Sequence, residues 1–162
     1  MTWKGGTNSF TIEVRAQGPG QDAQTRQVST GYMETIGAKL RQGRFFDDHD
    51  DAQVQPVAIV NETMARQFWS VENALGKRFK VDSDNGKNRW ITIVGVIGDI
   101  KEMGLEAPAK AEMFFPYKQW PRTLWNMPRD LVVRTSGDPM SVAAAARRAV
   151  WSVDSNQPVS TI

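Results

Sequence analysis

The 162-residue sequence contains no cysteine and a single histidine, His49. The absence of cysteine excludes disulfides, thiolate zinc sites and a cysteine nucleophile. Any mechanism that needs a histidine base must therefore use His49, which stands among the aspartates Asp47, Asp48, Asp50 and Asp51. A cysteine-free chain is compatible with the cytoplasm and with the periplasm alike.

Long apolar runs are also missing. The longest, residues 90–98, is far shorter than the roughly 20 residues that span a bilayer. The first six residues are not followed by the apolar stretch of a secretory signal, so we expect any targeting segment to lie beyond this sequence. The 20 Lys and Arg exceed the 18 Asp and Glu by only two, and they are scattered along the chain, which argues against a nucleic-acid-binding protein.

Metal and phosphate motifs fail when their spacing is tested. Residues 47–51 are the one cluster of metal-ligand types, but consecutive residues seldom converge on one ion, so a solvated loop is favoured over a metal site. Asp82, Asp84 and Gly86 resemble the start of a calcium loop, yet the glycine stands fifth rather than sixth and position twelve is Ile93. Phosphate-loop, dinucleotide and G-x-S-x-G patterns are incomplete. The sequence therefore predicts no catalytic, cofactor-binding or metal-binding residue, and no cofactor.

The hydrophobic periodicity predicts an α+β fold. The expected strands are residues 9–15, 25–28, 56–60, 77–81, 90–96, 111–117, 131–134 and 158–162. A short helix should begin near Ser29 or Thr30, either of which can cap it, and stop at Gly37. The apolar run 56–60 leads into Asn61, a good N-cap, which predicts a strand followed at once by a helix, the opening of a crossover unit.

The clearest helix follows Asp138, which should cap it, with Pro139 in the first turn. Its apolar residues share one stripe. We expect this stripe to face a sheet that contains residues 57–60 and 131–133. The members of the stripe used for this expectation are Val142, Ala146, Ala149 and Val150.

Trp120, Trp125 and Met127 lie in a stretch punctuated by prolines, which predicts a loop. Two interpretations of these side chains stay open. They fold back over the core, as most tryptophans do. Alternatively, together with Arg122 and Arg129, they form a partner-facing surface, because aromatic residues, Met and Arg are enriched in protein interfaces.

Four segments, taken in order and spacing, resemble the MacB-like periplasmic core domain of FtsX-type ABC transporter permeases. They are VSTGYMETIG at 28–37, PVAIVNE at 56–62, IVGVIGD at 93–99, and LVVRT at 131–135 with the helix that begins at 137–139. The resemblance extends over residues 25–162. Lys39 stands where many relatives carry proline, a difference that affects a turn and not the assignment.

The resemblance implies two lobes. A porter-like βαβ lobe, truncated at its N-terminus, would consist of residues 1–61 and 129–162, and an inserted strand-rich lobe of residues 62–128. It also implies a function without a catalytic site: an extracytoplasmic domain that contacts substrate or partner proteins and transmits ATPase-driven motion.

The partners implied are the permease's own transmembrane helices, a cytoplasmic ATPase subunit or domain, and a periplasmic partner protein, with a dimer in the full transporter and no nucleic acid. The location implied is the periplasmic or extracellular side of the bacterial cytoplasmic membrane. We therefore expect the chain to be an excised fragment of an integral membrane protein.

Two alternatives remain on the sequence alone. One is a free-standing periplasmic ligand-binding or adaptor protein, which flanking apolar runs of about 20 residues in the parent reading frame would exclude. The other is a hydrolase that uses Asp48 and His49, for which loss of activity on changing His49 is the test.

Overall fold

We describe a computed structural model, in which the described residues are 6–13, 21–69, 74–81, 89–100, 107–120 and 130–159. The chain divides into two compact units, Met1–Leu131 and Val132–Ile162. Within the described ranges, no helix has both the length and the apolar character needed to cross a membrane.

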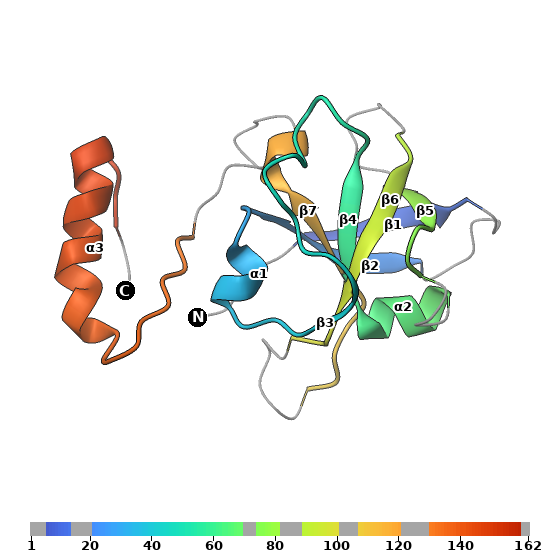
Figure 1. Cartoon of the computed structure of the whole chain (residues 1–162), viewed down its shortest axis with the longest axis horizontal. Helices are drawn as coiled ribbons and strands as arrows, with labels where there is room; N and C mark the ends of the chain where they lie inside the picture. Colours follow the sequence, from blue (N-terminus) through green and yellow to red (C-terminus); the bar gives the residue numbers. More distant parts are fainter. Residues whose placement is uncertain are drawn as a thin grey trace. The chain divides into compact units, whose positions relative to one another are not determined.

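The first unit is built on one mixed sheet of seven strands (Figure 1). The strands lie in the order β3-β6-β4-β7-β2-β1-β5, and β5 also pairs with β6. This extra pairing joins one end of the sheet back to its second strand, so that all strands except β3 close into a six-stranded barrel. The strands are β1 Gly6–Ile12, β2 Asp22–Val28, β3 Leu40–Gly43, β4 Val57–Asn61, β5 Arg78–Val81, β6 Ile91–Ile97 and β7 Glu112–Pro116.

Closure depends on β6, which pairs with three strands. One edge of β6 runs parallel to β4. The other edge is divided: β5 pairs antiparallel with its start, where Phe79 lies opposite Ile91, and β3 pairs antiparallel with its end, where Gly43 lies opposite Gly95. Among the described strands, β3 is therefore the one whose second edge has no strand partner.

The barrel interior is apolar, because every one of its six strands contributes to the same buried cluster. Phe10, Phe79 and Phe115 are at most 3% exposed and form a row of aromatic rings. Ring centroids lie 5.8 Å apart between Phe10 and Phe79 and 6.4 Å apart between Phe79 and Phe115. Phe68 extends the row at one end, 4.8 Å from Phe10. Each fully buried ring of this kind stabilises the fold by about 1.5–3 kcal/mol.

A second buried cluster covers the outer face of β4, β6 and β7. It includes Met33 from α1, Tyr32–Thr35. The predicted caps of this helix are wrong: its N-cap is Gly31, in the left-handed conformation with φ 81°, and it has no side-chain cap. Gly37, also at positive φ, follows the helix as predicted. The members of the cluster are Val28, Met33, Phe46, Val57, Ile59, Ile97 and Phe114.

The strand β4 leads directly into α2, Glu62–Phe68. All of β4 is buried, as its continuous apolar sequence predicts. The Asn61 Oδ1 accepts from the Met64 N–H at 2.9 Å, which confirms the predicted N-cap. The same oxygen accepts from the Glu112 N–H of β7 at 3.0 Å. Because β4 and β6 are parallel neighbours, the predicted crossover unit is confirmed as well.

The second unit contains α3, Met140–Val153. The Asp138 Oδ1 accepts from the Met140 N–H at 3.0 Å, and Pro139, the residue before the assigned helix start, already has helical φ −56° and ψ −33°, so Pro139 belongs to the first turn and Asp138 caps it as predicted. The predicted strand at 131–134 is wrong, since these residues form no strand and Leu131 is 71% exposed. Whether the stripe of α3 faces the sheet concerns both units, and it stays a prediction.

Helices and a mixed sheet together confirm the α+β class. The two-lobe division stays a prediction. The sheet pairs β4, in the range 1–61, with β6, in the range 62–128.

Candidate functional site

A groove lies at the point where β4 and β6 end. The two strands are parallel, so their carboxyl ends meet at one edge. The groove has a volume of about 460 Å³. Its lining comes from the connection between α1 and β3, from β3 itself, from the start of α2 and from the residues after β6. These residues are Ile36, Gly37, Ala38, Lys39, Arg41, Glu62, Gly98, Asp99 and Ile100.

Asp99 fixes the start of α2 against the end of β6. Its Oδ1 accepts from the Thr63 N–H at 2.9 Å, and its Oδ2 accepts from the Thr63 hydroxyl at 2.8 Å. The Arg66 Nη2 lies 3.4 Å from the same carboxylate. A carboxylate at the first turn of a helix also compensates the helix dipole. Asp99 is therefore an anchor of the groove wall, and both of its carboxylate oxygens already accept hydrogen bonds.

Arg41 and Glu62 face each other across the groove, with 3.3 Å between Arg41 Nε and Glu62 Oε2. Their side chains are 48% and 23% exposed. A guanidinium carries five N–H donors and a carboxylate has several acceptor positions, so one contact leaves most of both groups available. Gly98 lies beneath the pair: a Cβ there would stand 3.5 Å from Arg41 Nε and 3.6 Å from Glu62 Oε2.

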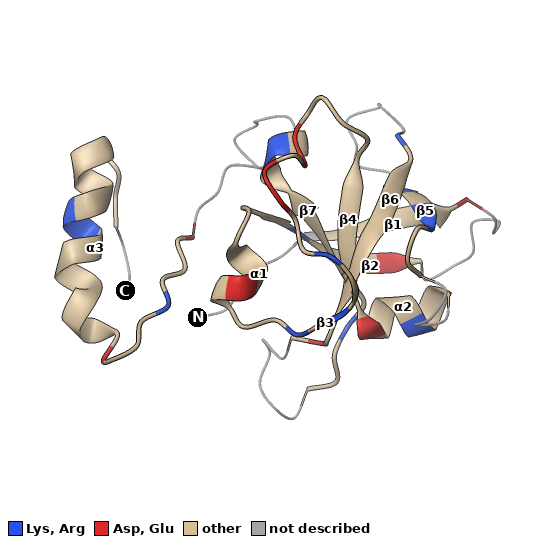
Figure 2. Cartoon of the chain, in the orientation of Figure 1, with Lys and Arg blue, Asp and Glu red and all other residues tan. Residues whose placement is uncertain are grey.

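The chain around β3 is basic. Lys39 is exposed beside Arg41, two residues along the same strand edge. Figure 2 shows the Lys and Arg positions on the chain leading into and through β3. The groove thus presents two cations and one partly engaged carboxylate, an arrangement suited to charged or hydrogen-bonding groups of a ligand.

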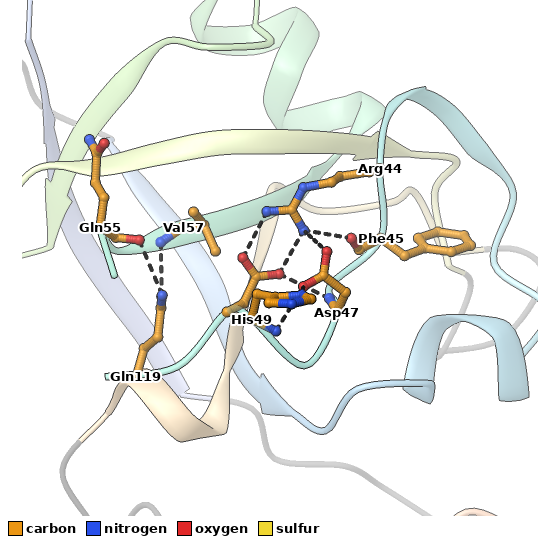
Figure 3. Close-up of polar contacts among 8 residues, drawn as sticks. Arg44, Phe45, Asp47, His49, Gln55, Val57 and Gln119 are labelled. Carbon is orange, nitrogen blue, oxygen red and sulfur yellow. Dashed lines mark hydrogen bonds and ion pairs between the residues drawn. The ribbon is translucent and has the colours of Figure 1, made fainter. Parts of the chain in front are cut away.

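The acidic segment 47–51 is held by Arg44. The Arg44 Nη1 and Nη2 each lie 2.7 Å from an oxygen of Asp50, whose side chain is only 3% exposed. Asp50 also accepts from the Asp47 N–H at 3.0 Å. Burial raises the pKa of Asp50, but the bonds from Arg44 and from the Asp47 N–H outweigh it, so the pKa lies below its ordinary value. Figure 3 shows Arg44 facing Asp47 and the carbonyl of Phe45.

The other acidic side chains point to separate partners. Asp48 accepts from the Lys118 ammonium at 3.0 Å, which lowers the pKa of Asp48. His49 is 96% exposed, and its Nδ1 lies 3.2 Å from Asp47 rather than beside Asp48. Across the described part of the chain, no three His, Asp or Glu side chains converge as metal ligands would. Asp47, Asp48 and His49 are exposed, as in the predicted solvated loop, whereas the buried Asp50 departs from that prediction.

The residues that follow β7 are tied to the start of β4. Gln119, which is buried, accepts from the Val57 N–H at 2.9 Å and donates to the Gln55 carbonyl at 3.1 Å (Figure 3). Trp120 is half-buried and packs against the barrel core, its ring centroid 4.9 Å from that of Phe115. Trp120 therefore belongs in part to the core.

Trp125 and Met127, the other two residues predicted to face a partner, lie outside the described residues. The partner-facing role of all three side chains stays a prediction. Sequence reasoning missed the groove, because its charged residues come from separate segments and form no motif. The one local signal was the strand, cap and helix at residues 56–62, which places Glu62 at the end of a buried strand.

The family described as the MacB-like periplasmic core domain matches residues 5–150 of the chain. A curated relative, the uncharacterized ABC transporter permease YknZ of Bacillus subtilis (strain 168), is 27% identical over 111 residues, which are 68% of this chain and 26% of the relative. The chain thus spans about a quarter of the length of that permease.

Two solved structures share the fold. The periplasmic region of MacB from Actinobacillus actinomycetemcomitans has a TM-score of 0.61 at 19% identity, over 91% of this chain and 65% of that one. A domain of a putative permease protein from Porphyromonas gingivalis has a TM-score of 0.57 at 20% identity, over 89% of this chain and 64% of that one.

Proposed function

The chain belongs to the family of MacB-like periplasmic core domains, and on that premise we propose that it contacts substrate or partner proteins and transmits ATPase-driven motion. Domains of this family are found in ABC transporter permeases, on the periplasmic or extracellular side of the bacterial cytoplasmic membrane. The observation that carries this proposal is the family match, which extends over residues 5–150.

The construction of the first unit supports a mechanical role. Six strands close into a ring around one aromatic core, and packed cores resist deformation. Asp99 and Asn61 lock α2 to the barrel, and Gln119 locks the chain after β7 to β4. A displacement applied at one point of such a unit moves the whole unit.

The proposed partners are the permease's transmembrane helices, a cytoplasmic ATPase subunit or domain, a second permease copy and a periplasmic partner protein. The sequence has no phosphate-binding loop, so the energy for motion would come from another chain or domain. Trp120, Trp125 and Met127 are proposed for the surface that meets the partner or substrate.

Spin labels in the intact transporter test the proposal. The 162-residue sequence has no cysteine, so a cysteine introduced into it gives one label position within this domain. One label at Gln53→Cys, an exposed site, and a second at the outer end of a transmembrane helix report the position of the domain. We expect their distance distribution to shift when ATP is added. An unchanged distribution in a transporter that hydrolyses ATP would contradict the proposal.

A matched control pair lies within the barrel unit. Labels at Gln53→Cys and Lys77→Cys, both exposed positions of the first unit, should keep one distance with and without ATP. A shift in this pair would show that the domain deforms instead of moving as a rigid body.

A further inference from the structure

Arg41 is the extra residue of a β-bulge in β3. Leu40 and Gln42, two residues apart, lie opposite neighbouring residues of β6, so Arg41 between them has no residue opposite it. A bulge breaks the regular alternation of a strand and re-aims a side chain. A Cβ built on Gly98 would stand 3.5 Å from Arg41 Nε and 3.6 Å from Arg41 Nη2, so the guanidinium lies over the floor of the groove. The bulge therefore directs this cation into the groove.

Arg41 has one edge of its guanidinium open to a ligand. The Nε lies 3.3 Å from Glu62 Oε2, and the Arg41 side chain is 48% exposed. In the part of the chain that the structure describes, Glu62 is the one carboxylate in an ion pair with Arg41. A guanidinium carries five N–H donors in a planar fork and receives a carboxylate through two parallel bonds. The edge formed by Nη1 and Nη2 is therefore where a second carboxylate would bind.

Lys39 adds a second cation, and the charges around the pair favour a ligand with one negative charge. The Gly98 N–H donates to the Lys39 carbonyl at 2.8 Å, which holds Lys39 beside the floor of the groove, and its side chain is exposed. Two carboxylates, Glu62 and Asp99, line the same groove. A second negative charge on the ligand would be repelled by them. A carboxylate therefore suits the groove better than a doubly charged phosphate.

Two isoleucines supply an apolar part of the lining. Ile36 and Ile100 both line the groove, and both are half-buried and pack against the second buried cluster, which fixes their positions. An apolar group of the ligand would lose its contact with water there. The volume of about 460 Å³ lies within the range of small-molecule sites.

We propose that the groove binds a carboxylate carried beside an apolar group, with the carboxylate on Arg41 and Lys39 and the apolar group on Ile36 and Ile100. This inference rests on the proposed function, in which the domain contacts substrate or partner proteins, and it names the chemistry of the group that is contacted. The end of a polypeptide chain whose last residue is apolar carries both groups, and so does a free organic acid.

The test uses the 162-residue chain and small probes, titrated while backbone amide resonances are followed. N-acetyl-leucine carries both groups, and we expect saturable shifts at Arg41 and Gly98. N-acetyl-leucinamide lacks the charge and should bind more weakly. N-acetylglycine lacks the apolar side chain and should also bind more weakly. Inorganic phosphate should bind more weakly than N-acetyl-leucine, because its second charge would face Glu62 and Asp99.

A peptide identifies the source of the carboxylate. An N-acetylated peptide of five alanines followed by leucine presents the same carboxyl end on a longer chain, and its amidated form is the control that should bind more weakly. If the free peptide binds at least as tightly as N-acetyl-leucine, the site takes the end of a polypeptide chain. If it binds less tightly, the site takes a free organic acid. Either result supports a carboxylate site.

Charge variants test the assigned residues. Arg41→Gln should weaken binding of N-acetyl-leucine by about two- to fivefold, the range of an exposed ion pair. Glu62→Gln should tighten it, because a negative charge beside the guanidinium is removed. Arg78→Gln is the matched control. Arg78 is 41% exposed and paired with Glu13, but it lies opposite Thr92 at the start of β6, the end away from the groove, so binding should not change.

Absence of saturable shifts, or equal binding of N-acetyl-leucinamide, would overturn the inference. Tighter binding of phosphate would overturn the carboxylate class, and equal effects of Arg41→Gln and Arg78→Gln would overturn the role of Arg41. These failures are distinct from failure of the proposed function. If the spin labels move with ATP and no probe binds, only the groove site is refuted; if the probes bind and the labels stay still, only the transmission of motion is.

Discussion

Gly43 of β3 lies directly opposite Gly95 of β6, and a Cβ on either would collide with backbone atoms across the pair, those of β6 or those of Arg44 just after β3. The Cβ of an alanine at Gly43 would stand 2.1 Å from the Val94 carbonyl oxygen. At Gly95 it would stand 2.4 Å from the Arg44 carbonyl oxygen. The two strands can approach this closely because both residues lack a side chain.

Gly43→Ala should destabilise the domain more than a positive φ angle alone explains. The φ of Gly43 is 73°, and the left-handed conformation costs a non-glycine residue about 1–2 kcal/mol. The collision adds about 1–3 kcal/mol of overpacking. Gly76→Ala is the matched control, with φ 76° and nothing within 4 Å of the added methyl group. Urea unfolding measures both, and equal losses would contradict the close approach.

Asp50→Asn should lower the free energy of unfolding at pH 7 by about 1.5–3 kcal/mol, the range of hydrogen bonds to charged groups. The folded-state pKa of Asp50 is depressed, so the unfolded chain takes up the proton first as the pH falls. The stabilisation is therefore complete above the ordinary carboxyl pKa of about 4, and it disappears as the pH falls through the folded-state pKa.

Urea unfolding of wild type and Asp50→Asn over a pH series checks this. The difference between them should shrink in acid. Asp48→Asn is the control: Asp48 is 81% exposed, so its ion pair with Lys118 should contribute about 0–1 kcal/mol. A difference for Asp50→Asn that persists unchanged in acid would show that charge is not its cause.

Arg26 of β2 and Glu112 of β7 form a buried ion pair between neighbouring parallel strands. Their side chains are 4% and 5% exposed. Replacing one partner leaves a buried charge, so Glu112→Leu should cost about 3–5 kcal/mol. The double variant Arg26→Met with Glu112→Leu should cost less than the single one. A double-mutant cycle by urea unfolding measures this, and purely additive losses would refute the coupling.

Trp120→Ala and Trp125→Ala should have different consequences. Trp120 packs on Phe115, so its truncation should reduce stability, by less than the about 3–5 kcal/mol of a fully buried aromatic residue. Trp125→Ala should impair transporter function and leave the melting temperature nearly unchanged. Thermal unfolding of both variants, with transport assays of the intact permease, tests this pair. A large loss of stability for Trp125→Ala would assign that side chain to the core.

Features set by neighbouring residues could be predicted from the sequence. A continuous apolar run followed by Asn61 predicted a buried strand, an N-cap and a helix, because each depends on a few adjacent residues. Asn85 and Gly86, between the strand-like runs 77–81 and 90–96, favour a hairpin turn and so predict that the two runs pair antiparallel, which β5 and β6 confirm. The turn itself lies outside the described residues.

Features that depend on residues far apart in the chain could not be predicted from the sequence. The strand β3 has one apolar residue, Leu40, and its pairing brings Gly43 opposite Gly95 of a strand far along the chain. Residues 131–134 were predicted as a strand and form none. Their β-branched residues suit a strand, but a strand also needs a partner to pair with, which strand propensity alone does not reveal. Arg41 and Glu62 meet in the groove only through the barrel topology.

The contacts of Asn61 explain why an amide stands at this position. Several residue types cap helices equally well, aspartate and serine among them. Asn61 also donates its Nδ2 to the Lys110 carbonyl at 2.8 Å, while its Oδ1 serves Met64 and Glu112. Aspartate would present only acceptors and set a carboxylate against that carbonyl, and serine would have a single oxygen for all three partners. The contacts with Lys110 and Glu112, at the start of β7, therefore favour asparagine over the other residues that cap helices. One side chain thus fixes both the start of α2 and the place where β7 enters the barrel.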